Sequence, residues 1–136
     1  MTSHHREMAA TMRAVSRVVT WAGGVALKHP QLSKASINAM RVCIQEIVSN
    51  VALHAKRLDG VPTVRVSLRI DDERIIVRIE DNGPPFDPVK QPPGKPDTDL
   101  ASADHGGRGL RIVRTITRQM SYMRAGEWNC LQLEIA

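Results

Sequence analysis

Apolar residues recur at three- and four-residue steps in two segments of the N-terminal half, which predicts two helices. The first covers residues 7 to about 28, and Pro30 ends the connection that follows it. The second begins after Ser33, a suitable N-cap, and runs to about Lys56. The apolar positions of the first helix are Met8, Met12, Val15, Val19 and Ala22; those of the second are Ile37, Met40, Ile44, Ile47 and Val51.

Alternation of apolar and polar residues follows, and it predicts a hairpin that turns at Asp71-Asp72. Further along, residues 108 to about 119 have the spacing of a third helix, and a closing hairpin turns at Gly126. These elements predict one domain, residues 1–136, with an α/β fold. We expect an α+β two-layer sandwich, in which a mixed, largely antiparallel sheet carries the helices on one face. The apolar strand positions are Val64, Val66, Leu68, Ile70, Ile75, Val77 and Ile79, and the closing hairpin covers 121–124 and 131–135.

The composition narrows the classes of partner and compartment. Lysine and arginine number 19 against 14 acidic residues, a formal net charge of +5, but aromatic residues make up only 3%. Because aromatics do not alternate with the basic residues, direct nucleic-acid binding is not expected.

The polar start, Met1 to Arg6, lacks the apolar run of a signal peptide, and no stretch suits a bilayer span. Cys43 and Cys130 have no metal-binding spacing. We therefore expect a cytoplasmic protein with no membrane partner.

Three polar residues lie on one side of the second predicted helix, beside its apolar stripe. Glu46, Asn50 and His54 follow one another at four-residue steps, so they share a face. An asparagine oxygen suits a hard cation such as Mg²⁺. A glutamate can accept a proton from a hydroxyl or orient a nucleophile. The spacing alone favours the alternative, a partly exposed polar helix edge.

Glycine-containing segments lie at both ends of a long proline-rich loop, about residues 84–107. The first, Asp81-Asn82-Gly83, follows a strand. Its carboxylate can accept a hydrogen bond from the exocyclic amine of adenine, although Asn-Gly is also an ordinary turn signal. The second, Gly106-Gly107-Arg108-Gly109-Leu110, directly precedes the third predicted helix, where free backbone N–H groups can bind an anion. A flexible hinge is the alternative for this segment.

In this order the three segments resemble the conserved boxes of the GHKL ATPase superfamily, which has the Bergerat fold. Glu46-xxx-Asn50-xxx-His54-Ala55 is similar to its N box, Asp81-Asn82-Gly83-xx-Phe86-Asp87 to its first glycine box, and Gly107-Arg108-Gly109-Leu110-xx-Val113 to its second. The proline-rich loop lies where the family has its ATP lid. The nearest likeness is to the anti-sigma-factor serine kinases of bacterial partner-switching systems. Members of that group usually begin with a short strand that often contributes to dimer contacts; no such strand is evident here, so a homodimer is left open.

The resemblance implies ATP and Mg²⁺ as cofactors and a role for each matching residue. Asn50 would hold the metal against the phosphates, and Asp81 would read adenine. Glu46 would be the base or orienter for a serine hydroxyl, with Arg108 near the transferred group. The substrate would be an anti-anti-sigma protein of the STAS type, and in its other state the protein would sequester a sigma factor or similar regulator. The remaining nucleotide-binding residues that the resemblance implies are His54, Gly83, Phe86, Gly106, Gly107, Gly109 and Leu110.

Other interpretations of the sequence remain open. The chain could be a nucleotide-gated binding protein without significant kinase activity, or a detached catalytic module of a histidine kinase. No helix with a phosphoacceptor histidine is evident, which disfavours the second. A row of arginines on the third predicted helix favours a solvated face, with a docking surface for an acidic partner as the alternative. These arginines are Arg108, Arg111, Arg114 and Arg118.

Overall fold

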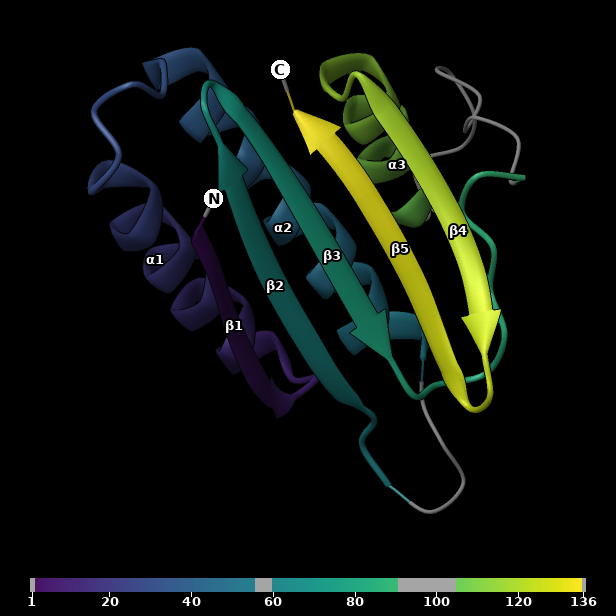
Figure 1. The fold of residues 1–136 in the computed structure, drawn as a ribbon. Coiled ribbons are helices and arrows are strands. Elements are labelled where there is room, and N and C mark those ends of the chain that lie inside the picture. Colours follow the sequence, from purple (N-terminus) through teal and green to yellow (C-terminus); the bar gives the residue numbers. More distant parts are fainter. Residues whose placement is uncertain (1, 56–59, 91–104, 136) are drawn as a thin grey trace.

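The computed structural model describes residues 2–55, 60–90 and 105–135, with the side chains of 105–108 excepted. In this part of the chain, five strands form one sheet and three helices cover one of its faces (Figure 1). The two-layer α/β sandwich is therefore confirmed. In chain order the elements are β1 (Thr2–Ala9), α1 (Met12–Leu27), α2 (Lys34–His54), β2 (Thr63–Asp71), β3 (Arg74–Asp81), α3 (His105–Ile116), β4 (Gln119–Ala125) and β5 (Trp128–Ile135).

The strand order is β1-β2-β3-β5-β4, and every described pair of neighbouring strands is antiparallel. The predicted hairpin is present, with Asp72 in its turn at a φ of 55°. The register aligns the apolar positions of adjacent strands, so that Leu68 lies opposite Val77 and Val77 opposite Leu133. All three side chains are fully buried beneath the helices. The register also places Asp81 between Val64 and Asn129, at the end of the sheet where β3 stops.

Helix α2 lies at the centre of the helical layer and contacts both α1 and α3. Ser33 is its N-cap, as predicted, and the Ser33 hydroxyl oxygen accepts the N–H of Ser36 at 3.0 Å. All five residues of the predicted apolar stripe are buried. The stripe fixes the rotation of α2, so the polar residues on its flank have a defined direction.

The N-terminus differs from the prediction. A strand, β1, occupies residues 2–9 and pairs with β2 along its whole length, so the expected absence of an N-terminal strand is wrong. The first helix starts at Met12 rather than at residue 7, because Thr11 caps it by accepting the N–H of Ala14 at 3.2 Å. An edge strand with one open side needs no apolar alternation, and most of β1 is polar and exposed.

The third helix is also displaced relative to its prediction. It begins at His105 and ends at Ile116, so Gly106, Gly107 and Gly109 lie in its first turns and not in a loop before it. The range expected for a lid, 84–107, therefore overlaps α3, and residues 91–104 lie outside the described part. The closing hairpin turns at Gly126, as predicted, with a φ of 60°. Among the described helices, none has the length and apolar character that a bilayer crossing requires.

Candidate functional site

Helix α2 and helix α3 meet where the Glu46 side chain reaches Gly109. A methyl group placed on Gly109 would lie 2.5 Å from Oε2 of Glu46 and 3.3 Å from its Cβ. Because Oε2 is the end of a flexible side chain, a side chain at position 109 would displace this carboxylate, whereas glycine leaves it in place. The contact brings the polar face of α2 to the glycine-rich start of α3, two segments that are more than fifty residues apart in the chain.

The end of β3 meets the end of α2 in a second close approach. A methyl group placed on Gly83 would lie 2.6 Å from the Cβ of Ala55, the C-cap of α2, and 3.0 Å from Oδ1 of Asp81. Asp81 itself is only 8% exposed. The three segments singled out in the sequence are therefore neighbours, since α2 contacts the turn after β3 at one point and α3 at another.

The Asp81 carboxylate is held by one of its two oxygens. Oδ1 accepts the backbone N–H of Gly83 at 2.9 Å and the side-chain N–H of Asn129 at 3.0 Å. No donor to Oδ2 is found in the described part of the chain. Because no described side-chain oxygen is both fully buried and without a partner, Oδ2 keeps some accessible surface, and such an oxygen can accept a hydrogen bond from a ligand.

Asn129, on β5, is a site residue that the sequence pattern did not predict. It is 5% exposed, and most of its side-chain hydrogen bonds go to the segment 81–86. Besides the bond to Asp81, its amide donates to the carbonyl of Pro84 at 2.8 Å, and its Oδ1 accepts the N–H of Phe86 at 3.2 Å and the hydroxyl of Tyr122 at 2.6 Å. Asn129 therefore fixes both the carboxylate and the chain that leaves β3. An asparagine inside a strand is an unusual choice, and that is the one signal the sequence offered.

Arginines from the last two elements hold the same segment by its carbonyl oxygens. Arg124 of β4 donates to the carbonyl of Gly83 at 2.8 Å. Arg114 of α3 donates to the carbonyls of Pro88 and Val89 at 2.6 and 3.1 Å. The spacing predicted a solvated position for Arg114, whereas here it ties α3 to the chain that follows β3. The segment 81–89 is therefore anchored from three elements.

The electrostatic environment of Asp81 is unusual for an aspartate. Burial raises the pKa of its carboxyl, and the hydrogen bonds from Asn129 and Gly83, together with the charge of Arg124, oppose this shift in part. On α2, burial and the neighbouring charge of Glu46 raise the pKa of the Cys43 thiol to about 12. Cys43 is a free, fully buried thiol. Perturbed groups of the Asp81 kind are common at binding and catalytic sites.

The remaining predicted site residues occupy varied positions. Asn50 is half-buried on α2, one turn beyond Glu46, and His54 is exposed near the end of the helix. Phe86 is 49% exposed, so it can cover a ligand. The Leu110 side chain is buried in the hydrophobic core, so it packs inside the protein. The side chain of Arg108 lies outside the described residues, as do those around Gly106 and Gly107, although their backbone belongs to α3.

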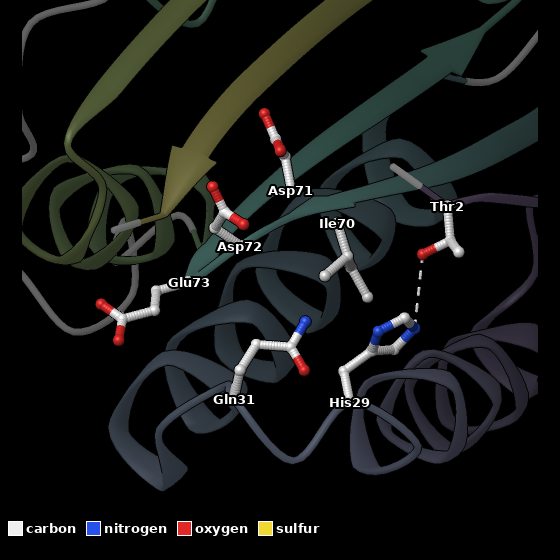
Figure 2. Close-up of a pocket in the computed structure, with 7 residues that line it drawn as sticks. All are labelled: Thr2, His29, Gln31, Ile70, Asp71, Asp72 and Glu73. Atoms are coloured by element: carbon white, nitrogen blue, oxygen red, sulfur yellow. Dashed lines mark hydrogen bonds between the residues drawn. The ribbon is translucent and has the colours of Figure 1, made fainter.

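A separate pocket of about 680 Å³ lies at the opposite end of the sheet, where β2 turns into β3 (Figure 2). Asp71, Asp72 and Glu73 line one side of it, and His29 and Thr2 line the other, joined by a 3.4 Å contact between Thr2 Oγ1 and His29 Nε2. Ile70 pairs with Ile75 at this end, whereas Asp81 pairs with Val64 at the other. The pocket is therefore not part of the site around Asp81.

Comparison with known proteins gives a consistent result for the whole chain. A family model described as the histidine kinase-like ATPase domain matches residues 8–135. Among curated proteins, the serine/threonine-protein kinase BtrW of Bordetella bronchiseptica is 26% identical over 127 residues, which cover 93% of this chain and 89% of that protein.

Two solved structures share the fold at low sequence identity. One contains the RsbU and RsbW domains of Rv1364c from Mycobacterium tuberculosis, with a TM-score of 0.67 and 15% identity over 99% of this chain. The other is the histidine kinase domain of a blue-light-activated histidine kinase from Erythrobacter litoralis, with a TM-score of 0.55 and 15% identity over 94% of this chain. This chain spans 32% and 61% of the lengths of those two chains.

Proposed function

The chain belongs to the histidine kinase-like ATPase domain family, and we propose that it is an ATP-dependent kinase that phosphorylates a serine of a partner protein. The observation that carries the proposal is the junction of three segments. Glu46 of α2 touches Gly109 of α3, while the C-cap of the same helix touches the turn that holds Asp81. In this proposal the base of a nucleotide lies at the Asp81 end of the junction and its phosphates at the Gly109 end.

Adenine recognition is assigned to Asp81. Its Oδ1 is occupied by two protein donors, and its Oδ2 has none among the described residues. The exocyclic amine of adenine is a hydrogen-bond donor, so it complements the acceptor Oδ2. Gly83 keeps the backbone beside this carboxylate free of a side chain, and Phe86 is exposed next to it. The site residues thus fit a purine with an amino group.

Phosphate and metal binding are assigned to α2 and to the start of α3. The first N–H groups of a helix have no intrahelical acceptor, and glycines in the first turns of α3 let an anion approach them. We assign the N–H groups of Gly106 and Gly107 to this role, and we assign Gly109, in the second turn, to leaving room for the phosphates beside Glu46. Asn50, half-buried on α2, offers a neutral oxygen to Mg²⁺, which neutralises phosphate charge when bound. A magnesium nucleotide requires both: N–H groups that bind its phosphates and an oxygen ligand for its metal ion.

Transfer to a serine is assigned to Glu46, with Arg108 near the transferred group. Phosphoryl transfer depends mainly on positioning and on charge neutralisation. The Glu46 carboxylate lies against Gly109, beside the assigned phosphate site, where it can accept the proton of an incoming hydroxyl or orient that hydroxyl. The similarity to the kinase BtrW supports a serine or threonine hydroxyl as acceptor.

For the partner we propose an anti-anti-sigma protein of the STAS type, with a sigma factor or similar regulator bound in the other state. The support comes from the nature of the relatives, a serine/threonine-protein kinase and a structure that contains an RsbW domain. A cytoplasmic location and possible assembly into a homodimer belong to the same proposal. The contacts around Asp81 and Glu46 do not identify the partner protein, so the partner is tested by a separate experiment.

That experiment uses ATP labelled at the γ-phosphate. The protein is incubated with Mg²⁺, labelled ATP and STAS-type proteins from its own genome, with Glu46→Ala as the matched control. The proposal predicts label on one of these proteins, stable to acid and recovered as phosphoserine. Nucleotide binding without label on any of them would support a nucleotide-gated binding protein, and acid-labile label on histidine would support a histidine-kinase module. Either result would overturn the serine kinase.

A further inference from the structure

Strand β4 forms one edge of the sheet, next to β5, and two of its side chains support the site around Asp81 (Figure 1). Tyr122 lies opposite the buried Leu131, and Arg124 lies opposite the buried Asn129, so both side chains point toward the helical layer. Neither residue belongs to the three segments that the sequence indicated as nucleotide-binding. The contribution of β4 to the site therefore arises from the tertiary structure alone.

Arg124 joins two turns at the same end of the sheet. Its Nη1 donates to the carbonyl oxygen of Gly83 at 2.8 Å, and its Nε donates to the carbonyl oxygen of Gly126 at 3.1 Å. The N–H of Gly83 in turn donates to Oδ1 of Asp81 at 2.9 Å. Arg124 therefore holds in place the residue that occupies one oxygen of Asp81.

Tyr122 supports the same oxygen by a second route. Its hydroxyl donates to Oδ1 of Asn129 at 2.6 Å, and the amide of Asn129 donates to Oδ1 of Asp81 at 3.0 Å. Burial raises the pKa of Tyr122 above its ordinary value of 10.0, so this hydroxyl is neutral and remains a donor near neutral pH. Both routes end on Oδ1, and neither supplies a donor to Oδ2.

The guanidinium of Arg124 also acts on Asp81 through its charge. Burial raises the pKa of the Asp81 carboxyl, whereas the hydrogen bonds from Asn129 and Gly83 and the charge of Arg124 lower it. Within the described part of the chain, Arg124 bonds to carbonyl oxygens and to no carboxylate, so no salt bridge neutralises its charge. A cation in this position favours the ionised form of the buried carboxylate.

The protonation state of Asp81 decides what its Oδ2 offers to a base. The ionised carboxylate is an acceptor only, which suits the exocyclic amine of adenine, whereas the protonated form carries an O–H donor, which suits a carbonyl oxygen. We propose that Arg124 is a positioning residue for adenine recognition, because it holds Gly83 and keeps Asp81 in its acceptor form. The inference rests on the proposed function of Asp81 and deepens it, since it names the residue that maintains the selectivity for adenine.

Other charged and titratable groups belong to the elements packed around Asp81. His54 lies at the end of α2, Asp87 in the segment after β3, and Arg114 on α3. Arg65 of β2 points to the other face of the sheet, where its guanidinium carbon lies 3.7 Å from the centre of the Trp128 ring. Since histidine side chains titrate near neutral pH, the test includes an Asp81→Asn background that retains His54.

The test compares ATP with ITP, whose base has a carbonyl oxygen where adenine has its amine. Calorimetry measures the affinity of both magnesium nucleotides between about pH 5 and pH 8, and the ratio of the two affinities cancels the titration of the shared triphosphate. The preference for ATP should be full above the pKa of Asp81 and should fall as the pH falls through it. In Arg124→Gln this fall should occur at a higher pH, and in that interval the variant should discriminate at least about three-fold less than the wild type.

Four variants serve as controls. Arg124→Lys keeps the charge and should restore most of the wild-type pH profile, while Arg124→Met repeats the charge removal should the glutamine variant fail to fold. Arg69→Gln removes the same charge from an exposed residue on the other face of the sheet and should leave the profile unchanged. In the Asp81→Asn background, Arg124→Gln should change the preference by less than about two-fold at every pH, because no carboxylate remains for its charge to act on.

Three results would overturn the inference. Equal losses of affinity in Arg124→Gln and Arg124→Lys, with the wild-type pH profile of the preference, would make Arg124 a structural residue of the turn. An effect of Arg124→Gln that persists in the Asp81→Asn background would show that it does not act through Asp81. The same change of profile in Arg69→Gln would make the effect one of net charge.

Failure of the proposed function itself gives a different result. If Asp81 does not recognise adenine, Asp81→Asn alone leaves the ratio of ATP to ITP affinity at its wild-type value. If Asp81 recognises adenine without help from Arg124, Asp81→Asn changes this ratio while Arg124→Gln leaves its pH profile as in the wild type.

Discussion

Asp81→Asn separates adenine recognition from folding, because the two oxygens of Asp81 have different partners. Oδ1 accepts Gly83 N–H at 2.9 Å and the Asn129 amide at 3.0 Å, and the introduced amide oxygen can accept both. The introduced amide nitrogen replaces Oδ2, which has no donor in the described part of the chain. The internal network therefore survives, while the group that faces the nucleotide changes from acceptor to donor.

The stability of the folded protein should not fall in this variant at neutral pH. Burial raises the pKa of Asp81 above its ordinary value of 3.8, so the folded state holds this proton more tightly than the unfolded chain does. The contribution of Asp81 to the free energy of unfolding is therefore largest at low pH. It decreases as the pH rises from the ordinary pKa to the raised pKa of the folded state, and it is constant at higher pH. The amide has no such titration, so Asp81→Asn should be at least as stable as the wild type at pH 7.

Nucleotide affinity should change in the opposite direction. A hydrogen bond to a charged group contributes about 1.5–3 kcal/mol, so its loss weakens Mg-ATP binding roughly 10- to 150-fold. The introduced donor suits the carbonyl oxygen of hypoxanthine, which stands where adenine has its amine. The preference for ATP over ITP should therefore shrink or reverse in the variant.

Isothermal titration calorimetry with Mg-ATP and Mg-ITP measures both affinities, and thermal unfolding between pH 4 and pH 8 measures the stability. Asn50→Ala serves as a reference variant, since it should weaken both nucleotides alike. A folded Asp81→Asn protein with wild-type affinity for ATP would refute the recognition of adenine by Asp81. Lower stability than the wild type at pH 7 would show that the buried charge of Asp81 does not destabilise the folded state.

The other predictions concern four positions. Asn50→Ala should weaken Mg-ATP binding at least about ten-fold, because it removes an oxygen ligand of the metal, and unchanged affinity in calorimetry would contradict this. Glu46→Ala should leave ATP affinity within a few-fold and lower phosphoserine formation; equal losses of both would make Glu46 structural. Gly109→Ala should also slow transfer, because its methyl group would lie 2.5 Å from Glu46 Oε2, and a wild-type rate in the labelling assay would count against the contact. Cys43 should resist thiol reagents at pH 8 in the folded protein, since its pKa is about 12, and modification detected by mass spectrometry before unfolding would show that it is accessible.

Much of the fold follows from local patterns. The apolar stripe of α2 defines that helix and its direction, because five residues at regular spacing leave only one face to bury. The alternation in β2 and β3 defines their hairpin in the same way. The order of Glu46, Asp81 and Gly109 along the chain resembles that of a known family, and this resemblance indicates that they share a site. No local pattern shows that these residues are neighbours.

What the sequence does not reveal depends on tertiary contacts. Strand β1 is an exposed edge, so its polar residues carry no apolar period, and only pairing with β2 makes it a strand. Gly106, Gly107 and Gly109 favour a loop by intrinsic propensity. Helix α3 nevertheless includes them, because Leu110 and Val113 are buried in the core. Asn129 escapes prediction because its importance arises from the register that sets it opposite Asp81.

The proposed site requires that α2, the turn after β3 and the start of α3 surround one nucleotide. Amide chemical shifts of the ¹⁵N-labelled protein, recorded as Mg-ATP is added, report on all three segments at once. We predict that residues 46–54, 81–86 and 109–113 change together with a single binding constant, while Asp81→Asn reduces the response of all three. Changes confined to one segment, or fitted only by different constants, would contradict this arrangement.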